Sequence, residues 1–571
     1  MRMHWPFALL AVIGFALIFI NLGSDYLWED EGDTAVLASN ILRFGLPKAW
    51  DGVAFLDSDQ GARLNDHLVM VSHPWVQYYL AAASFALFGE NTLAGRLPFA
   101  LAGWLTILVA YLFVYDLTRN RWAGFCSAAL LTCSVQFLLY CRQCRYYSLN
   151  MFFGSLLLWV FFGMRSARSC ALFTILGILL FHSHPFGIVL VGALGLVSLV
   201  YPSFRAQRRW FCLSGPVIAV FTLPWIALAR HGYAENSQLV RSVAQFCGRV
   251  IQYLIECASM TPLIGIAILS VIWGVRSVLQ ARTAHVTGPE VRDQVLNRNE
   301  LGLLLITFVT LVCYDVAIAA TESTDELWDI GIRYTTTMIP LTAMIAGVLI
   351  IKISRARVAI WLPLLLLFSF TKLAQMTPWI FWGAKVTTFD GKEVVEAHLP
   401  PNITERFLNT GQQLMFFRDL WQENPGTLAK ACQFLQKNAK PGDMLITNYD
   451  WEPLYFYTRL PQALKILPEY PIGEAARRNG LPNYVFGVDG VRWVIWRPVW
   501  ESYVGYSGEK LERQILAGGA RVEPVAQFEE TIWENRPEIH HHRFSADKYL
   551  FTAPKNLPSA EVFRIDWPES Q

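Results

Sequence analysis

The chain has 571 residues, of which 54% are hydrophobic and only 16% are charged, and its mean hydropathy is +0.33. Soluble proteins carry about 25% charged residues, so the composition excludes an ordinary soluble protein and predicts a membrane protein. The formal net charge of +2 supplies no overall positive field that would attract nucleic acid. Only one of the ten cysteines, Cys432, follows residue 380, so no disulfide framework is expected in the polar tail.

Apolar runs of roughly the length that crosses a bilayer, about 20 residues, recur from residue 5 to about residue 377. They predict eleven transmembrane helices, at residues 5–22, 95–115, 122–140, 146–164, 170–186, 187–201, 211–229, 251–275, 300–320, 335–351 and 358–377. Basic residues fall in alternate loops, among them Arg119, Arg165 and Lys352, and the positive-inside rule assigns these loops to the cytoplasm. Because the number of spans is odd, the N-terminus is expected in the cytoplasm and the polar tail on the other side of the membrane.

The polar tail has the mixed composition of a soluble protein. A helix is predicted over 428–437, and short apolar runs predict buried strands at 444–447 and 493–496. Helices that alternate with short strands are typical of an α/β domain. The predicted architecture is therefore a polytopic α-helical membrane module, residues 1–379, followed by a soluble extracytoplasmic α/β domain, residues 380–571.

The segment between the first two predicted spans, residues 23–94, contains the acidic cluster Trp28-Glu29-Asp30-Glu31-Gly32-Asp33. Two amphipathic helices are predicted in the same segment, at 34–44 and 75–88, and both are expected to lie flat at the outer surface. Asp30 and Glu31 are expected at the outer membrane face, where apolar surface favours the uncharged form of a carboxyl group. They could then serve as a general base for an acceptor hydroxyl or amine, or as ligands for Mg²⁺ or Mn²⁺. The alternative is a solvated loop whose acids cap the helix that begins near Thr34.

Positive and aromatic residues gather at the predicted outer ends of two spans: Arg142, Arg145 and Tyr147 at one, and Arg333 and Tyr334 at the other. Guanidinium groups bind phosphate bidentately, so these positions are candidates for holding a phosphate at the headgroup level. The alternative is that they extend along the membrane interface or pair with the acids of the outer loops.

Three histidines are further candidates for phosphate or metal contacts. His182 and His184 lie two residues apart in a predicted outer turn, and His73 precedes the second surface helix in His73-Pro74-Trp75. Imidazole binds metals and phosphates, but ordinary polar turn residues explain the same pattern.

Taken in order along the chain, these features resemble the glycosyltransferase-C superfamily. The nearest branches are the protein O-mannosyltransferases, the aminoarabinose transferases and bacterial glycosyltransferases of the lipopolysaccharide-core type. The resemblance rests on the order of five short motifs over residues 5–377: Asp30-Glu31, His73-Pro74-Trp75, Ala94-Gly95-Arg96-Leu97-Pro98, Arg142 to Tyr147, and Arg333-Tyr334.

The resemblance implies a membrane glycosyltransferase that takes a sugar from a polyprenyl-phosphate donor. The acceptor would be a lipid, a glycan or a protein at the outer face of the cytoplasmic membrane. Asp30 would be the catalytic base with Glu31 as its neighbour, and Arg142, Arg145, Arg333 and Tyr334 would hold the donor phosphate. The chain departs from the aminoarabinose branch at His73, where that branch has lysine, and at Asn150, the nearest counterpart of a second acid.

Two alternatives stay open from the residues. A single base would give displacement with inversion at the anomeric carbon, whereas a second carboxylate from the acidic cluster would permit retention. A transporter or flippase for lipid-linked sugars would also place charges in a membrane protein, although transporters often show internal repeats and none is visible here.

Overall fold

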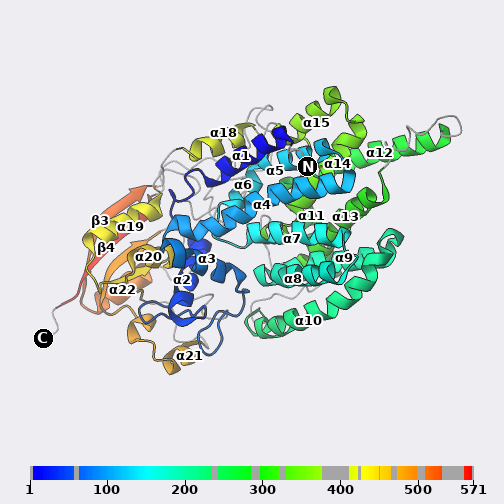
Figure 1. Cartoon of the computed structure of the whole chain (residues 1–571). Coiled ribbons are helices and arrows are strands. Elements are labelled where there is room, and N and C mark those ends of the chain that lie inside the picture. The colour runs from blue at the N-terminus through cyan, green and yellow to red at the C-terminus, as the bar shows by residue number, and fades with distance from the viewer. Residues whose placement is uncertain are drawn as a thin grey trace.

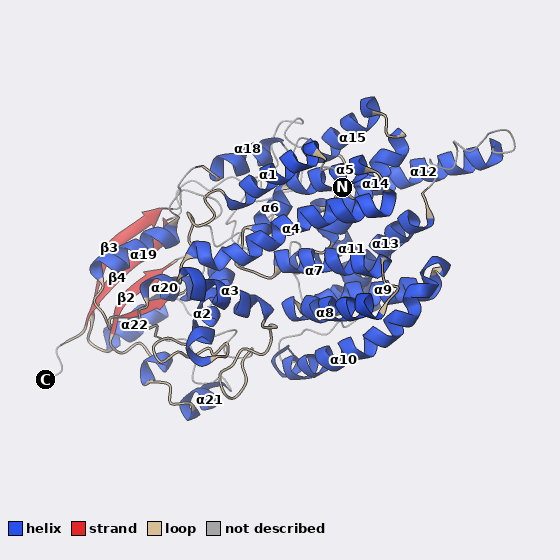
Figure 2. Cartoon of the chain, in the orientation of Figure 1, coloured by secondary structure: helices blue, strands red, loops and turns tan. Residues whose placement is uncertain are grey.

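The computed structural model describes residues 4–56, 63–233, 242–283, 296–321, 330–375, 410–421, 426–448, 451–463, 472–497, 508–529 and 558–568. Long apolar helices lie side by side through most of the molecule, and a small sheet with its own helices lies at one end of them (Figure 1). The strands drawn in Figure 2 are confined to that end. Helices α2 (Glu29–Phe44) and α3 (Val76–Phe88) lie between the two parts.

The apolar helices correspond in position to the predicted spans. They are α1 (Trp5–Phe19), α4 (Thr92–Thr118), α5 (Arg121–Cys133), α6 (Val135–Cys141), α7 (Tyr147–Phe162), α8 (Ala167–Ser183), α9 (Ile188–Val200), α10 (Arg205–Tyr233), α11 (Val243–Met260), α12 (Leu263–Thr283), α13 (Arg298–Thr321), α14 (Met338–Ser354) and α15 (Val358–Phe370). Within the described residues, three helices are long and apolar enough to cross a membrane alone, at Thr92–Thr118, Pro202–Ala227 and Arg298–Ala320. The bent pair α5 and α6 would make a fourth. The predicted count of eleven spans is therefore not confirmed.

Two predicted spans are interrupted in the structure. The run predicted as one helix over 251–275 is divided into α11 and α12, because Thr261 is extended (φ −124°, ψ 155°) immediately before Pro262. Proline disfavours the helical conformation in the residue that precedes it. The other interruption is a 71° bend between α5 and α6 at Ser134, whose hydroxyl accepts a hydrogen bond from the Phe137 amide at 3.3 Å. The segment that follows α6 reaches the acidic cluster, where the Cys144 amide donates a hydrogen bond to Glu31 at 2.6 Å.

Helix α14 lies at the centre of the helical part and is buried along nearly its whole length. It packs on α5, where Gly347 has no side chain and leaves room for Ser127. The Ser127 hydroxyl donates a hydrogen bond to the Met344 carbonyl across this contact at 3.2 Å. Small residues at helix contacts allow the close backbone approach that stabilises helix pairs in membranes.

The acidic cluster is part of a helix and is not a loop before one. Helix α2 begins at Glu29, five residues earlier than the predicted start at Thr34. The Glu31 carboxylate accepts a hydrogen bond from the Trp28 amide at 3.3 Å, and acidic residues in a first turn interact favourably with the helix dipole. Gly45 ends the helix with φ 74°, a conformation that glycine adopts without strain.

The sheet contains β1 (Met444–Thr447), β2 (Val491–Trp496), β3 (Arg521–Glu529) and β4 (Pro558–Asp566) in the order β1-β2-β4-β3. Strands β1 and β2 are parallel, and the other pairings are antiparallel. Helices α19 (Thr427–Asn438), α20 (Trp451–Thr458) and α22 (Gly508–Ala517) pack around it. Helix α21 (Ile472–Arg478) packs with α2 and α3, and α18 (Thr410–Asp419) lies on the apolar helices, where Gln413 donates to the Cys133 carbonyl at 2.9 Å. The predicted helix at 428–437 and both predicted strands are present, whereas β3 and β4 were not predicted. The predicted domain boundary at residues 379/380 lies outside the described residues.

Candidate active site

Asp30, in the first turn of α2, lies between two arginines from distant parts of the chain. Its Oδ2 lies 2.9 Å from Nη1 of Arg333, in the short helix η4 (Ile330–Thr335). Its Oδ1 lies 3.3 Å from Nη2 of Arg145. The Asp30 side chain is 22% exposed and the Arg333 side chain 23%, whereas that of Arg145 is only 3% exposed. The pair Asp30–Arg333 is therefore accessible from outside, and Arg145 forms the base of the site.

Arg145 is bound to α2 by several hydrogen bonds. Its Nη1 donates to the Asp30 carbonyl at 3.0 Å, to Oδ2 of Asp33 at 3.2 Å and to the Thr34 hydroxyl at 3.1 Å. Burial raises the pKa of the Asp33 carboxyl group, and the adjacent Arg145 opposes that rise. The guanidinium thus compensates two carboxylates. Burial lowers the pKa of Arg145, but its negative neighbours, chiefly Asp30 and Asp33, raise that pKa by more, so the guanidinium remains charged.

A stack of aromatic rings lies beside Arg333. The His184 ring lies between Tyr146, with ring centroids 4.2 Å apart, and Tyr334, with centroids 4.8 Å apart. The Arg333 guanidinium lies over the Tyr334 ring, 5.4 Å from its centroid. Tyr147 is fully buried and lies close enough to Arg333 and Asp30 to interact with both charges. The stack restricts the orientation of Arg333.

His73 lies beside the His184 ring of this stack. It is buried, and its ring centroid lies 6.5 Å from that of His184. Its Nδ1 lies 3.1 Å from the Ser72 hydroxyl. Burial lowers the pKa of His73 well below its usual value, and the positive charges of Arg63 and Arg145 add to this effect. His73 is therefore an uncharged polar group at neutral pH.

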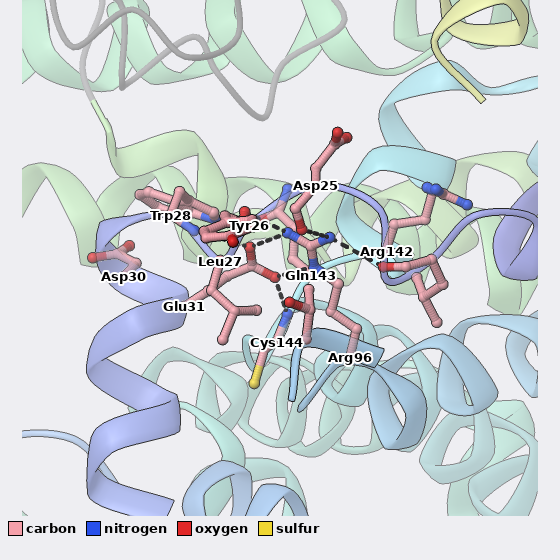
Figure 3. A network of polar contacts seen from close by, with 12 residues as sticks. Asp25, Tyr26, Leu27, Trp28, Asp30, Glu31, Arg96, Arg142, Gln143 and Cys144 are labelled. Atoms are coloured by element: carbon pink, nitrogen blue, oxygen red, sulfur yellow. Dashed lines mark hydrogen bonds and ion pairs between the residues drawn. The ribbon is translucent and has the colours of Figure 1, made fainter. Parts of the chain in front are cut away.

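Glu31 faces away from this centre, although it follows Asp30 directly in sequence (Figure 3). It is fully buried and binds Arg96 of α4 bidentately, at 2.8 Å to Nε and 2.7 Å to Nη2. It also accepts a hydrogen bond at 2.6 Å from the amide of Cys144, the residue directly before Arg145. Arg96 in turn donates hydrogen bonds to the backbone carbonyls of residues 22, 25 and 26, in the loop between α1 and α2. The predicted catalytic role of Glu31 does not fit these contacts, which make Glu31 a support that joins α2, α4 and the 142–147 segment.

Two other predicted site residues lie elsewhere. Arg142 is on the far side of the Glu31 network from Asp30 (Figure 3) and donates to carbonyls at the end of α1, at 2.8 Å to Ile18 and 2.8 Å to Ile20. These carbonyls have no partners within the helix, so Arg142 caps α1. The Nε2 atom of His182 lies 3.0 Å from the Phe221 carbonyl in α10. Neither side chain joins the cluster around Asp30 that the sequence led us to expect.

The carboxylates do not fit the Mg²⁺ or Mn²⁺ site that the sequence left open. Asp30 and Asp33 are bound to arginines in the cluster, and Glu31 is bound to Arg96. In the described part of the chain, no group of three histidine, cysteine or acidic side chains is arranged to hold a metal ion. A phosphate fits the site better, since buried donors near Asp30 have no hydrogen-bond partner among the described residues, among them Nε of Arg145, Nε of Arg333 and the Tyr78 hydroxyl. Buried polar groups are normally paired.

Sequence reasoning missed three contributors to the site. Arg63 supplies a further positive charge near Asp33 and His73, and nothing in the sequence around it indicated this. Asp33 was treated only as a member of the acidic cluster. Arg96 carried a usable signal, because an arginine at the start of an apolar span predicts a buried partner.

Known proteins with a similar sequence or structure support the membrane-helical fold described above. A family model described as dolichyl-phosphate-mannose-protein mannosyltransferase matches residues 72–228, which include His73, Arg145 and His184 but not Asp30 or Arg333. No curated protein matches the sequence. ArnT from Cupriavidus metallidurans bound to undecaprenyl phosphate is similar in structure, with a TM-score of 0.55 and 14% identity over 97% of both chains.

The apo state of the same ArnT also has a TM-score of 0.55, with 16% identity over 91% of this chain and 96% of that chain. An Archaeoglobus fulgidus oligosaccharyltransferase in complex with Zn and sulfate has a TM-score of 0.46 and 12% identity, over 89% of this chain and 70% of that chain. The resemblance to the glycosyltransferase-C superfamily that the sequence indicated is thus confirmed by the family model and by the ArnT-like fold.

Proposed function

We propose that the protein is an integral-membrane glycosyltransferase that moves a hexose or pentose from a polyprenyl-phosphate donor to a lipid, glycan or protein acceptor. The observation that carries this proposal is the partly exposed Asp30 carboxylate held between Arg145 and Arg333. A general base and two phosphate-binding cations are the groups that such a transfer needs. The undecaprenyl phosphate bound to ArnT supports the same class of donor for this chain.

The reaction follows from the positions of these groups. Asp30 accepts the proton of the acceptor hydroxyl, whose oxygen forms the new bond to the anomeric carbon. The bond from that carbon to the phosphate oxygen breaks, and its electron pair stays on the lipid phosphate. Arg145 and Arg333 stabilise the negative charge that develops on this leaving group.

The two arginines are shared between Asp30 and the donor phosphate. While they contact Asp30, they stabilise its ionised form and weaken it as a base. A bound phosphate competes for the same guanidinium groups, so donor binding increases the basicity of Asp30. We therefore expect the donor to bind first and the acceptor second.

The accessible carboxylates support inversion. Retention needs a second carboxylate that can reach the sugar. Glu31 is fully buried against Arg96, and Asp33 has one oxygen buried and the other on Arg145. Among the three acids of the cluster that are bound to Arg145 or Arg96, Asp30 is therefore the one that an acceptor can reach. A single displacement with Asp30 as the base inverts the configuration at the anomeric carbon.

An apolar cavity of about 590 Å³ between α11, α12 and α13 is a candidate site for the polyprenyl chain. Its lining includes Leu254, Ala258, Ile264, Leu304 and Phe308. Helix α11 contacts η4, which carries Arg333. A polyprenyl chain in this cavity would thus contact α11, the helix that also touches η4 and Arg333. A lipid-linked donor needs its lipid site and its phosphate site to be connected in this way.

The proposed location is the cytoplasmic membrane, with the N-terminus in the cytoplasm and residues 380–571 in an extracytoplasmic region. The alternation of basic loops supports this orientation. The active site would then face the outer leaflet.

The proposal is tested with purified protein in proteoliposomes that contain a radiolabelled polyprenyl-phosphate sugar and membrane extract as the source of acceptor. Transfer of label out of the donor lipid is the expected result, and nuclear magnetic resonance of the product should show inverted configuration. Movement of the labelled lipid between leaflets without transfer would contradict the proposal and indicate a flippase.

A further inference from the structure

Helix α20, which follows strand β1 of the sheet, packs directly against α2 beside the candidate site (Figure 1). The contact is closest at Gly32, two residues after Asp30. A Cβ atom at Gly32 would lie 2.6 Å from both the nitrogen and Cδ of Pro453. Real side chains do not approach a backbone atom so closely, so only glycine permits this packing. The first turn of α2 is thus positioned by a residue from the C-terminal part of the chain.

Tyr457, four residues further along α20, holds the chain that leads into α2. Its hydroxyl accepts a hydrogen bond from the Leu27 amide at 2.8 Å and lies 2.7 Å from the Thr92 hydroxyl at the start of α4. Its ring packs on Tyr26, with centroids 4.0 Å apart. One hydroxyl therefore ties the residues before Asp30 to the helix that carries Arg96.

The same C-terminal region also contacts the other end of α2. Tyr455 of α20 is hydrogen-bonded to Asp51, which pairs with Arg43 in the last turn of α2 at 3.4 Å. Tyr484 donates a hydrogen bond to the Val53 carbonyl at 2.6 Å. These contacts join the C-terminal region to the end of α2 at Arg43, whose backbone lies about 20 Å from Asp30 along the helix axis. They attach the sheet region without reaching the candidate site.

We propose that Pro453 and Tyr457 are positioning residues of the active site, so that the C-terminal region completes the site and is not only an attached domain. They act through α2, by fixing where the Asp30 carboxylate lies relative to Arg145 and Arg333. This inference rests on the proposed function. It predicts that loosening α20 slows turnover far more than it weakens donor binding. Asp30 is part of α2 and moves with it, whereas the backbones of Arg145 and Arg333 belong to other elements and only the contacts of their side chains with α2 would change.

The test compares two variants of the full-length protein in proteoliposomes. Tyr457→Phe removes the hydroxyl that binds Leu27, and Tyr484→Phe removes a hydroxyl of the same region at the far end of α2. The measurements are turnover at saturating polyprenyl-phosphate sugar, the dissociation constant of undecaprenyl phosphate, and hydrogen exchange of amides 27–33. A displaced catalytic group typically costs about 10- to 100-fold in rate.

We expect Tyr457→Phe to lower turnover about tenfold, to change donor affinity less than twofold and to speed exchange at Leu27. Tyr484→Phe should resemble the wild type in all three measurements. Equal turnover of the two variants, in a preparation whose wild type is active, would overturn the positioning role alone. Absence of transfer in the wild type would overturn the proposed function, and the positioning role with it.

Gly32→Ala serves as an independent second variant, since its methyl group must displace α20 or α2. We expect a larger loss of turnover than for Tyr457→Phe, again with donor affinity retained. Wild-type turnover in Gly32→Ala would overturn the inference, because the close contact at Pro453 would then have no influence on Asp30.

Discussion

The Asp30 carboxylate accepts a hydrogen bond from Arg333 at 2.9 Å, although the two residues are 303 positions apart in the chain. The contact joins the first turn of α2 to the short helix before α14. Arg145 reaches the same carboxylate from the end of the broken span formed by α5 and α6. The candidate site is thus assembled from three segments that only the fold brings together.

Arg333 is expected to bind the donor phosphate, and Arg142 is expected to stabilise the fold. Removing a hydrogen bond to a charged group costs about 1.5–3 kcal/mol, so Arg333→Gln should weaken undecaprenyl phosphate binding by about 10- to 100-fold. Arg142→Gln should leave that affinity unchanged and lower the melting temperature, because the carbonyls at the end of α1 lose their cap. Isothermal titration and thermal melts in detergent measure both effects. Weaker phosphate binding in Arg142→Gln would restore the role first predicted for that residue.

Glu31 is expected to matter for stability more than for chemistry. Removing one partner of a buried ion pair costs about 3–5 kcal/mol, since the other charge stays buried without compensation. Glu31→Gln should therefore melt at a lower temperature than the wild type. The double variant Glu31→Gln/Arg96→Gln should recover part of the loss because no unpaired charge remains. A stable but inactive Glu31→Gln would show that Glu31 takes part in catalysis.

His73 is expected to make stability depend on pH. Its pKa in the folded protein lies well below the usual 6.5, so below about pH 6.5 the unfolded chain binds a proton that the folded protein does not bind. Stability should therefore fall as pH decreases from 7 to 5, by up to about 1.4 kcal/mol per pH unit for this group. His73→Gln should flatten the dependence of melting temperature on pH. An unchanged slope would show that His73 takes up a proton equally well in the folded protein.

The apolar cavity is expected to select donors by the length of their lipid. Ala258→Trp places a large ring in the cavity and should raise KM about tenfold for an undecaprenyl-phosphate sugar, equivalent to roughly two methylene groups left unburied. A donor with only ten lipid carbons serves as the control and should be used equally well by both proteins. Equal KM values for the long donor would place the polyprenyl chain elsewhere.

Much of the helical part could be predicted from the sequence, because long apolar runs have few alternatives to a membrane helix. The division of 251–275 was missed although Thr261-Pro262 carries its signal, since hydropathy alone does not register proline. Strands β3 and β4 were missed because half-buried and exposed residues mix along β3 and give no apolar run.

The candidate site could be predicted in part. Asp30, Arg145 and Arg333 were assigned to one face of the membrane from their places at span ends, and the structure brings their side chains together. Adjacent acids could not be told apart, because a helix turns about 100° per residue and directs Asp30 and Glu31 to different arginines. Arg142 and Arg145, which both follow α6, could not be told apart from the sequence either, although Arg142 binds the end of α1 and Arg145 binds Asp30.

The most direct test of the account is the transfer rate of Asp30→Asn from a polyprenyl-phosphate sugar in proteoliposomes, measured beside Asp66→Asn, an exposed acid of the same segment. Loss of a general base lowers turnover by about 10²- to 10⁴-fold. We expect a loss of this size in Asp30→Asn, with undecaprenyl phosphate bound at least as tightly because Arg145 and Arg333 are released from the carboxylate. Asp66→Asn should retain wild-type turnover. Wild-type turnover in Asp30→Asn would contradict the central claim that this carboxylate is the base of a sugar transfer.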